Sequence, residues 1–323
     1  MATKGRKLMA WTIGTIVVLA IAAFIALQFA INRNGPAVLN AVDRLTGGDR
    51  GTQLVMTHTY GDSAFQKLAV YAADGAADGD DTGPKPVLVF AHGGSWRSGD
   101  PDDYGFIGRA IAPEGFVVVL AGYRLGDESI FPAILEDTAS VIAWTKHNIA
   151  RYGGDPDAIY ISGHSAGAYN VVMTALDRQW LGRAGLDDDA IKGVIGLSGP
   201  YDFFPFDSDS TKFTFGSTPN AEQVTQPIAF ARGDAPPMLL MSGEKDTVVR
   251  PRNTRVLAAK ISEMGGTAQT RFFPEMDHIA ILTAIASPWR RDPAVLEAIT
   301  DFVKETEQAR QTQISVPVQA ESP

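Results

Sequence analysis

The sequence predicts an α/β protein with a mostly parallel central sheet and helices on both faces. From residue 86 onward, short apolar runs alternate with longer segments of helical periodicity. Runs such as PVLVFAH, FVVVLAGYR and PMLLMSG are apolar on both sides of an extended chain, which is typical of strands buried on both faces. Strands of this kind that alternate with helices form a parallel sheet between two helical layers. A chain of 323 residues is long enough to bury such a core.

The individual elements can be placed in order along the chain. GTQLVMTHTYG and QKLAVYAA, both ahead of residue 86, predict two short antiparallel strands. Buried strands are then expected within PVLVFAH, FVVVLAGYR, AIYISGHS, GVIGLSG, PMLLMSG and TRFFPEM. Helices are expected over residues 103–113, 134–152, 166–179, 252–264 and 293–308.

The N-terminal 31 residues predict a basic cytoplasmic stub and a single transmembrane helix. An uncharged run of 24 residues, 8–31, follows three basic residues and no acidic one. A helix of that length reaches about 36 Å, enough to cross a hydrocarbon layer of ~30 Å. The basic flank predicts that the main domain lies on the extracytoplasmic side. A cleaved signal peptide, which would make the protein secreted, is the main alternative because residues 20–22 match an A-x-A site; a buried core helix is the third.

The rest of the chain divides into a polar linker, one main domain and a tail. We expect the linker at residues 32–50, the main domain at 51–308 and a disordered tail at 309–323. A small cap is expected as an insertion at 200–237. The acidic, turn-rich stretch 72–86 lacks the spacing of a calcium-binding loop and predicts a solvated hairpin loop.

Composition excludes several classes of protein. The chain has no cysteine, which excludes a disulfide framework, a thiolate zinc site and a cysteine nucleophile. Its five histidines are too scattered to suggest a metal centre, and we expect no metal or organic cofactor. A net charge of −9 argues against nucleic-acid binding, which needs clustered basic residues. The sequence does not indicate an oligomeric state.

The pentapeptide Gly-His-Ser-Ala-Gly at residues 163–167 is the first motif that carries chemistry. A predicted strand precedes it and a predicted helix follows it. A turn this tight forces the serine into a strained conformation, so only small neighbours avoid a clash. Ser165 then lies at the carboxyl edge of the sheet and at a helix N-terminus, where the helix dipole favours developing negative charge. This placement predicts that Ser165 is a nucleophile.

A serine hydroxyl needs a base within hydrogen-bond reach, and a carboxylate to orient that base. Where a nucleophilic serine occupies such a turn, the order along the chain is serine, acid, histidine. His278 is the only histidine after Ser165. Asp246, three residues beyond the strand PMLLMSG, is the preferred acid. Asp202 and Glu244 remain as rivals.

The tripeptide His-Gly-Gly at residues 92–94 predicts the third component of the site. It follows a buried strand, where a glycine loop can bring its backbone N–H groups to a substrate carbonyl without an intervening side chain. We therefore expect the oxyanion donors to be the backbone amide of Ala166 and that of Gly93 or Gly94.

Together HGGSW, GHSAGA, GEKDTVV and the Asp-His pair of PEMDHI resemble the α/β-hydrolase family, in particular its carboxylesterase and feruloyl-esterase-like branch. The resemblance covers residues 53–303. It implies the α/β-hydrolase fold, with Ser165, Asp246 and His278 as the catalytic residues and an oxyanion loop that starts at Gly93. One departure is that lipase-like members read HGGG where this chain has Ser95 and Trp96. The HGGxW form also occurs in relatives similar to kynurenine formamidase.

Candidates for the substrate pocket lie near the same edge of the sheet. Trp96 and Tyr123 follow strand ends, where each could line the pocket or simply pack in the core, and His164 is expected to pack beside the nucleophile. The cap contains five phenylalanines, which could form an aromatic pocket or the small core of the insertion. Phe203 and Phe204 are the two named for the pocket, and the other three are Phe206, Phe213 and Phe215.

These observations predict a serine hydrolase that acts on carboxylic esters of small or medium acyl or aromatic acids. An aryl formamidase, amidase or peptidase would use the same three residues, because serine acyl transfer also serves amides. A non-catalytic binding protein tethered to a membrane is the alternative from another class. The expected partners are a small-molecule ester and, through the N-terminal helix, a membrane.

Overall fold

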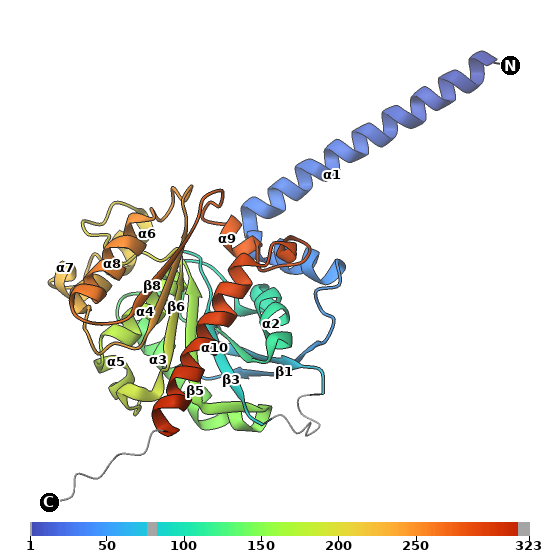
Figure 1. The fold of residues 1–323 in the computed structure, drawn as a ribbon. Helices are drawn as coiled ribbons and strands as arrows, with labels where there is room; N and C mark the ends of the chain where they lie inside the picture. The colour runs from blue at the N-terminus through green and yellow to red at the C-terminus, as the bar shows by residue number, and fades with distance from the viewer. Residues whose placement is uncertain (1, 76–82, 316–323) are drawn as a thin grey trace, which may run out of the picture.

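The computed structural model describes residues 2–75 and 83–315 (Figure 1). Residues 76–82 of the predicted acidic hairpin loop and residues 316–323 of the predicted tail lie outside the described residues.

An eight-stranded sheet forms the centre of the domain, in the order β1-β2-β4-β3-β5-β6-β7-β8. The first two strands pair with each other in antiparallel fashion, β2 pairs with β4 in the same way, and all remaining neighbours are parallel. The prediction of a mostly parallel sheet is therefore confirmed. The strands are β1 (Thr52–Thr59), β2 (Lys67–Ala73), β3 (Lys85–Ala91), β4 (Val117–Ala121), β5 (Gly154–His164), β6 (Gly193–Leu197), β7 (Met238–Gly243) and β8 (Ala268–Phe273).

Helices cover both faces of the sheet, as the strand pattern predicts (Figure 1). One layer contains α3 (Ala133–Asn148), α4 (Ala166–Leu176), α5 (Gln179–Arg183) and α8 (Arg252–Glu263), and the other contains α2 (Gly105–Ile111), α9 (Ala280–Thr283) and α10 (Ala294–Ser315). Strand β3 shows why both layers form. Val87 and Val89 belong to the hydrophobic core under the first helical layer. Leu88 and Phe90 point the opposite way and belong to the core under the second layer.

Short elements complete the chain. The cap between β6 and β7 contains α6 (Asp209–Phe215) and α7 (Ala221–Val224). The 3-10 helices are η1 (Pro101–Tyr104), η2 (Ala112–Glu114), η3 (Gly126–Glu128), η4 (Ile149–Tyr152), η5 (Asp188–Ala190), η6 (Pro227–Phe230) and η7 (Trp289–Arg291).

Helix α1 (Ala2–Leu45) breaks once, at Asn34, and the part before this break extends away from the domain (Figure 1). Asn34 has non-helical angles, φ −155° and ψ 81°, and its side-chain oxygen accepts the N–H of Ala37 over 3.2 Å. It therefore caps the part of α1 that follows, which also starts with a proline, Pro36. Among residues 2–75 and 83–315, no helix combines the length and apolarity that a membrane crossing requires. The transmembrane helix thus stays a prediction.

The expected linker at residues 32–50 needs correction, because the chain is helical as far as Leu45 and packs on the domain. Asp43 receives a hydrogen bond from Arg109 Nε of α2 over 2.7 Å, and both side chains are buried. The second oxygen of Asp43 accepts the backbone N–H of Ser287 over 2.7 Å. Leu39, one turn earlier, joins the core under α2. Because the buried carboxylate of Asp43 is fully paired, the polar segment at residues 32–50 can pack as part of the domain.

The predicted tail also starts later than expected, because α10 continues to Ser315 rather than ending at residue 308. Glu307 accepts a hydrogen bond from Tyr160 over 2.6 Å and pairs with Arg310, three residues ahead, over 2.6 Å. Pairs at this spacing support a helix, so the polar extension remains helical.

Candidate functional site

Ser165 lies on the sharp turn between β5 and α4. Its backbone angles, φ +54° and ψ −119°, are in a region that non-glycine residues rarely adopt. A Cβ on Gly163 would lie 2.4 Å from the carbonyl carbon of Gly167, and a Cβ on Gly167 would lie 2.1 Å from the carbonyl oxygen of Ala91. Only glycine therefore fits at these two positions, as the sequence predicts. The turn holds the Ser165 hydroxyl at the carboxyl edge of the sheet.

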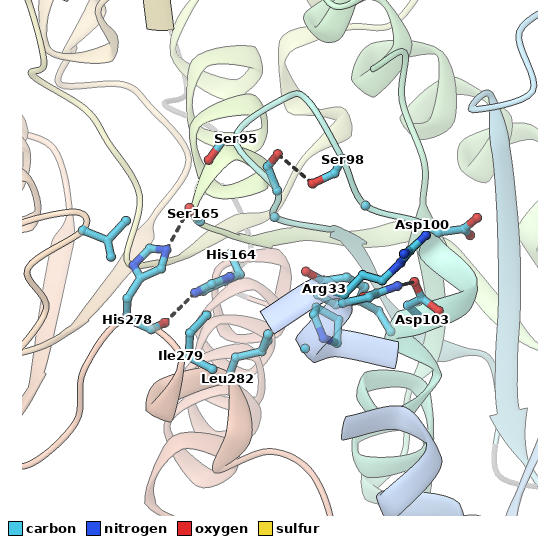
Figure 2. Close-up of a pocket in the computed structure, with 18 residues that line it drawn as sticks. Arg33, Ser95, Ser98, Asp100, Asp103, His164, Ser165, His278, Ile279 and Leu282 are labelled. Carbon is cyan, nitrogen blue, oxygen red and sulfur yellow. Dashed lines mark hydrogen bonds between the residues drawn. The ribbon is translucent and has the colours of Figure 1, made fainter. Parts of the chain in front are cut away.

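Two hydrogen bonds connect the Ser165 hydroxyl to a carboxylate through an imidazole. His278 Nε2 lies 3.0 Å from Ser165 Oγ, although 113 residues separate them (Figure 2). His278 Nδ1 lies 2.8 Å from Asp246 Oδ2. The histidine stands on the loop between β8 and α9, and the aspartate on the loop after β7. The structure thus brings all three predicted residues together at one edge of the sheet.

The surroundings of Asp246 keep its carboxylate charged. Its other oxygen, Oδ1, accepts the backbone N–H groups of Val248 over 3.0 Å and Val249 over 2.9 Å. Burial by itself would raise the pKa of Asp246, but the hydrogen bond and charge of His278, together with the Val249 N–H, hold that pKa below its ordinary value. A charged Asp246 favours the imidazole tautomer that has its proton on Nδ1 and a free lone pair toward Ser165.

The two rival acids have other partners. Asp202 pairs with Arg252 over 2.6 Å. Glu244 pairs with Arg255 at the surface. The carboxylate hydrogen-bonded to His278 is that of Asp246 alone among the described residues.

The loop after β3 passes directly against the Ser165 turn. A Cβ on Gly93 would lie 3.0 Å from His164 Nδ1 and 3.4 Å from Ser165 Cβ. Gly94 has φ +125°, and a Cβ there would overlap the carbonyl oxygen of Ser98 at 1.9 Å. Only glycine therefore lets the loop come this close, and Gly93 and Gly94 both line the cavity beside Ser165. Across that space, Ala166 opens α4, so its N–H has no partner within the helix.

The same loop is held in a strained conformation by contacts that sequence reasoning did not find. Ser95 and Trp96 have φ of +54° and +59°, in the left-handed region. The indole N–H of Trp96 donates to the buried Asn170 Oδ1 over 3.0 Å. Asn170 carries no motif and lies inside an apolar helix, so its only signal is that a polar residue interrupts a buried segment.

His164 connects the turn to the loop that carries His278. Its Nε2 donates to the backbone carbonyl of His278 over 2.8 Å, and the two rings lie 4.7 Å apart (Figure 2). Burial, reinforced by the charge of His278, lowers the pKa of His164 to about 3. The ring is therefore neutral near pH 7. It packs beside the nucleophile, as expected.

Tyr123 is a correction, because it lines neither cavity at the site. Its hydroxyl donates to the carbonyl of His92 over 2.8 Å, and its ring stacks on that of His92 with centroids 4.5 Å apart. Both side chains are buried, and burial lowers the pKa of His92 to about 4. His92 in turn donates from Nδ1 to the carbonyl of Gly93 over 2.7 Å. Tyr123 thus supports the glycine loop from beneath.

Two cavities meet at Ser165. The α1-side cavity, of about 500 Å³, lies between the glycine loop, His278 and residues 33–36 of α1 (Figure 2). The cap-side cavity, of about 600 Å³, lies between Ala166, the cap and residues 247–253. Of the predicted pocket residues, His164 lines the α1-side cavity, and Trp96, Phe203 and Phe204 line the cap-side cavity.

The cap phenylalanines combine both roles that the sequence left open. Phe215 is fully buried and packs edge-on against Trp96, with ring centroids 4.9 Å apart, and against Tyr169 at 5.1 Å. Phe204 instead has 42% of its surface exposed and faces the cap-side cavity. Phe203 stacks on Trp96 at 6.3 Å and contributes to both.

The fold and the site together define an α/β-hydrolase. The sheet is mostly parallel, its fifth strand turns sharply at a serine, and an imidazole and a carboxylate lie at the same edge. Residues 76–261 match the BD-FAE family, and the chain belongs to this α/β-hydrolase esterase family.

Similar proteins agree with this assignment. Esterase LipQ of Mycobacterium tuberculosis is 29% identical over 235 residues, which cover 68% of this chain and 55% of LipQ. A probable isoprenylcysteine alpha-carbonyl methylesterase of Oryza sativa is 33% identical over 46% of this chain and 35% of its own length. The chain thus spans about half or less of the length of these curated relatives. The crystal structure of esterase B from Lactobacillus rhamnosis, inhibited by a tributyrin phosphonate, shares the fold with a TM-score of 0.71 and 19% identity, covering 90% of this chain and 98% of that one.

Proposed function

We propose that this protein is a serine hydrolase that cleaves carboxylic esters of small or medium acyl or aromatic acids. The observation that carries the proposal is the pair of hydrogen bonds from Ser165 Oγ through His278 to Asp246, at 3.0 and 2.8 Å. Membership of an esterase family and the esterase names of its relatives support the ester as substrate.

The mechanism starts with proton transfer from the Ser165 hydroxyl to His278 Nε2 as Oγ attacks the ester carbonyl carbon. Asp246 holds the ring in the required tautomer and stabilises its positive charge. The tetrahedral intermediate then collapses, its bond to the alcohol oxygen breaks, and His278 returns the proton to that oxygen. Water repeats the sequence on the acyl-enzyme and releases the acid.

The negative oxygen of each tetrahedral intermediate needs backbone donors. Gly93 and Gly94 line the α1-side cavity and Ala166 lines the cap-side cavity, and both cavities reach Ser165, which supports the backbone N–H of Ala166 and that of Gly93 or Gly94 as the donors. Removing one such donor typically lowers kcat by about 10²- to 10³-fold. The strained loop at residues 93–96 is held in place before substrate binds, so these donors need little rearrangement during the reaction.

The deciding experiment compares the wild-type chain with Ser165→Ala. We expect the wild type to hydrolyse p-nitrophenyl acetate and butyrate and to be labelled by a fluorophosphonate probe. Ser165→Ala should lose both properties, with a drop in kcat of roughly 10⁶-fold, and keep its circular dichroism spectrum. A variant that retains most of the activity would refute the assignment.

A substrate panel tests the ester preference itself. N-formylkynurenine and an aminoacyl anilide present the same acyl-transfer chemistry with amide leaving groups. We expect p-nitrophenyl butyrate to be turned over with the highest kcat/KM of the three. A higher value for N-formylkynurenine would make the protein a formamidase instead. A correctly folded chain that turns over none of the three substrates and is not labelled would favour a binding protein.

We also propose that α1 anchors the protein in a membrane, with the hydrolase domain on the extracytoplasmic side. The support is the uncharged run at residues 8–31 and the basic residues before it. Val18, Leu19 and Phe29 in this run each expose more than 60% of their surface, and exposed apolar surface of this kind calls for a covering partner. Carbonate-resistant membrane association of the fluorophosphonate-labelled chain is expected. A labelled soluble form that lacks the first residues would establish signal cleavage.

A further inference from the structure

The two cavities at Ser165 differ in their relation to His278. His278 forms part of the wall of the α1-side cavity, together with His164 and Leu282 (Figure 2). The wall of the cap-side cavity instead contains Ala166, Trp96, Phe203 and Phe204. Ser165 borders both.

This difference assigns the two halves of an ester to the two cavities. When the bond between the carbonyl carbon and the alcohol oxygen breaks, the proton on His278 Nε2 moves to that oxygen, so the two atoms must be about 3 Å apart. The alcohol therefore leaves on the side of His278 and extends into the α1-side cavity. The acyl group stays bonded to Ser165 Oγ and extends past Ala166 into the cap-side cavity.

One wall of the α1-side cavity comes from the N-terminal helix, which is far from Ser165 in the sequence. Arg33, Asn34 and Pro36 line it, and Figure 2 shows Arg33 across the cavity from His278. The wall is fixed to the domain. Asn34 Nδ2 donates to Asp103 Oδ2 over 2.6 Å. Two turns further on, Asn40 Nδ2 donates to the carbonyl of Asp102 over 2.9 Å.

The charged side chains that line the α1-side cavity differ in whether they already have a partner. Asp103 accepts from Asn34, and Asp100 pairs with Lys67 over 2.8 Å. Arg33 forms no ion pair with any residue that the structure describes, and its side chain is exposed to the cavity. Its five N–H donors are thus available to a ligand.

We propose that residues 33–36 of α1 form the leaving-group subsite, and that Arg33 selects alcohols that carry hydrogen-bond acceptors. The inference rests on the proposed esterase function and deepens it. The favoured substrates are esters of hydroxylated alcohols, whose free oxygens accept from the guanidinium. An ester of a plain hydrocarbon alcohol offers no such acceptor, so the N–H groups of Arg33 remain hydrogen-bonded to water. The cap-side cavity, whose wall combines the aromatic rings of Trp96, Phe203 and Phe204 with polar residues, selects the acid instead.

The test uses the full-length chain and two substrate series. In the first, the acid is constant and the alcohol varies, with glycerol monobutyrate compared with ethyl butyrate by titration of the released acid. In the second, the alcohol is constant and the acid varies, with p-nitrophenyl hexanoate compared with p-nitrophenyl acetate. The variants are Arg33→Ala and Asn34→Ala on α1, and Phe204→Ala on the cap. Arg151→Ala, an exposed arginine after α3, is the matched control.

Arg33→Ala is expected to lower the kcat/KM ratio of glycerol monobutyrate to ethyl butyrate by about tenfold, the size of one hydrogen bond to a charged group. Its hexanoate-to-acetate ratio should stay within twofold of the wild type. Phe204→Ala should change only the second ratio, and Arg151→Ala neither. Equal changes in both series for Arg33→Ala, or no change in the first, would overturn the proposal.

Two controls separate this proposal from the proposed function. A wild-type chain that hydrolyses none of these esters, or a Ser165→Ala variant that does, contradicts the esterase function itself. An active wild type with an inactive Ser165→Ala, but with alcohol preference independent of Arg33, contradicts only the subsite. If Asn34→Ala lowers the thermal midpoint by releasing α1, the exposed Arg33 variant decides alone.

Discussion

His164 Nε2 donates a hydrogen bond to the backbone carbonyl oxygen of His278 over 2.8 Å. The residue next to the candidate nucleophile thereby holds the loop that carries the candidate base. Because the pKa of His164 is lowered to about 3, this ring remains a neutral, fixed donor across the physiological pH range. Its role is to set the distance between His278 and Ser165 rather than to exchange protons.

Replacing His164 should therefore weaken turnover through geometry. We expect His164→Leu, which cannot donate, to lower kcat by about 10²-fold, since small displacements of reacting groups have effects of this size. His164→Gln keeps an N–H donor and should recover part of the loss. The measurement is kcat on p-nitrophenyl butyrate across pH 5–9. A Leu variant as active as the wild type would show that the hydrogen bond does not position His278.

The identity of the acid can be tested with three neutral substitutions. Asp246→Asn keeps the shape of the side chain but removes the charge that orients His278, and should lower kcat by about 10⁴-fold. Asp202→Asn and Glu244→Gln are the controls, because those carboxylates pair with Arg252 and Arg255. Both should retain kcat within a few-fold. A larger loss in either control than in Asp246→Asn would reassign the acid.

The glycines around Ser165 should tolerate no side chain. Gly167→Ala would place a methyl group 2.1 Å from the carbonyl oxygen of Ala91, which is backbone and cannot move aside. We expect a destabilisation of at least about 2 kcal/mol in urea unfolding and loss of activity. Gly182→Ala on α5 is the control, since a Cβ there meets nothing within 4 Å and alanine should stabilise the helix by about 0.5–1 kcal/mol. Equal stability of the two variants would contradict the steric argument.

The sequence allowed the sheet and the three central residues to be predicted, because both depend on local patterns. Runs such as VVVLA in β4 are short and rich in β-branched residues, which favours buried strands, and the tight turn at Ser165 requires glycines at fixed positions. His278 follows because only one histidine lies after Ser165.

The predictions that the structure corrects depend on contacts between residues that are distant in the sequence. The sequence around Asp43 predicts a solvated charge in a linker, but Asp43 pairs with Arg109, 66 positions away. Tyr123 follows a strand end at the correct edge, but its hydroxyl donates to the carbonyl of His92 beneath the glycine loop. Periodicity describes which side of an element is buried, and it carries no information about such partners.

Acid should destabilise the fold through its buried histidines. The pKa values of His164 and His92 are lowered to about 3 and about 4, whereas unfolded histidines titrate near 6.5. Below pH 6.5 the unfolded chain therefore binds protons that the folded chain does not. The free energy of unfolding should fall as pH drops from 6.5 toward about 4, by about 1.4 kcal/mol per pH unit for each histidine.

Urea unfolding at pH 7.0, 6.0 and 5.0 measures this slope. His164→Gln and His92→Gln each remove one titrating ring, so each should flatten the pH dependence even if it lowers stability at pH 7. His147→Gln, on the exposed side of α3, is the control and should leave the slope as in the wild type. A wild-type stability that does not change between pH 7.0 and 5.0 would contradict the prediction.

The buried pair of Asp43 and Arg109 should be essential for attaching α1 to the domain. Asp43→Ala leaves the Arg109 guanidinium buried without its counter-charge and the Ser287 N–H without an acceptor, and we expect a loss of about 3–5 kcal/mol. Glu275→Ala, which breaks an exposed pair with Lys245, is the control and should cost less than about 1 kcal/mol. Loss of this pair should release α1 from the domain, including residues 33–36, which form a wall of the α1-side cavity. Proteolysis near residue 33 should therefore accelerate in Asp43→Ala but not in Glu275→Ala. Unchanged stability and protection in Asp43→Ala would mean that α1 is attached by other contacts.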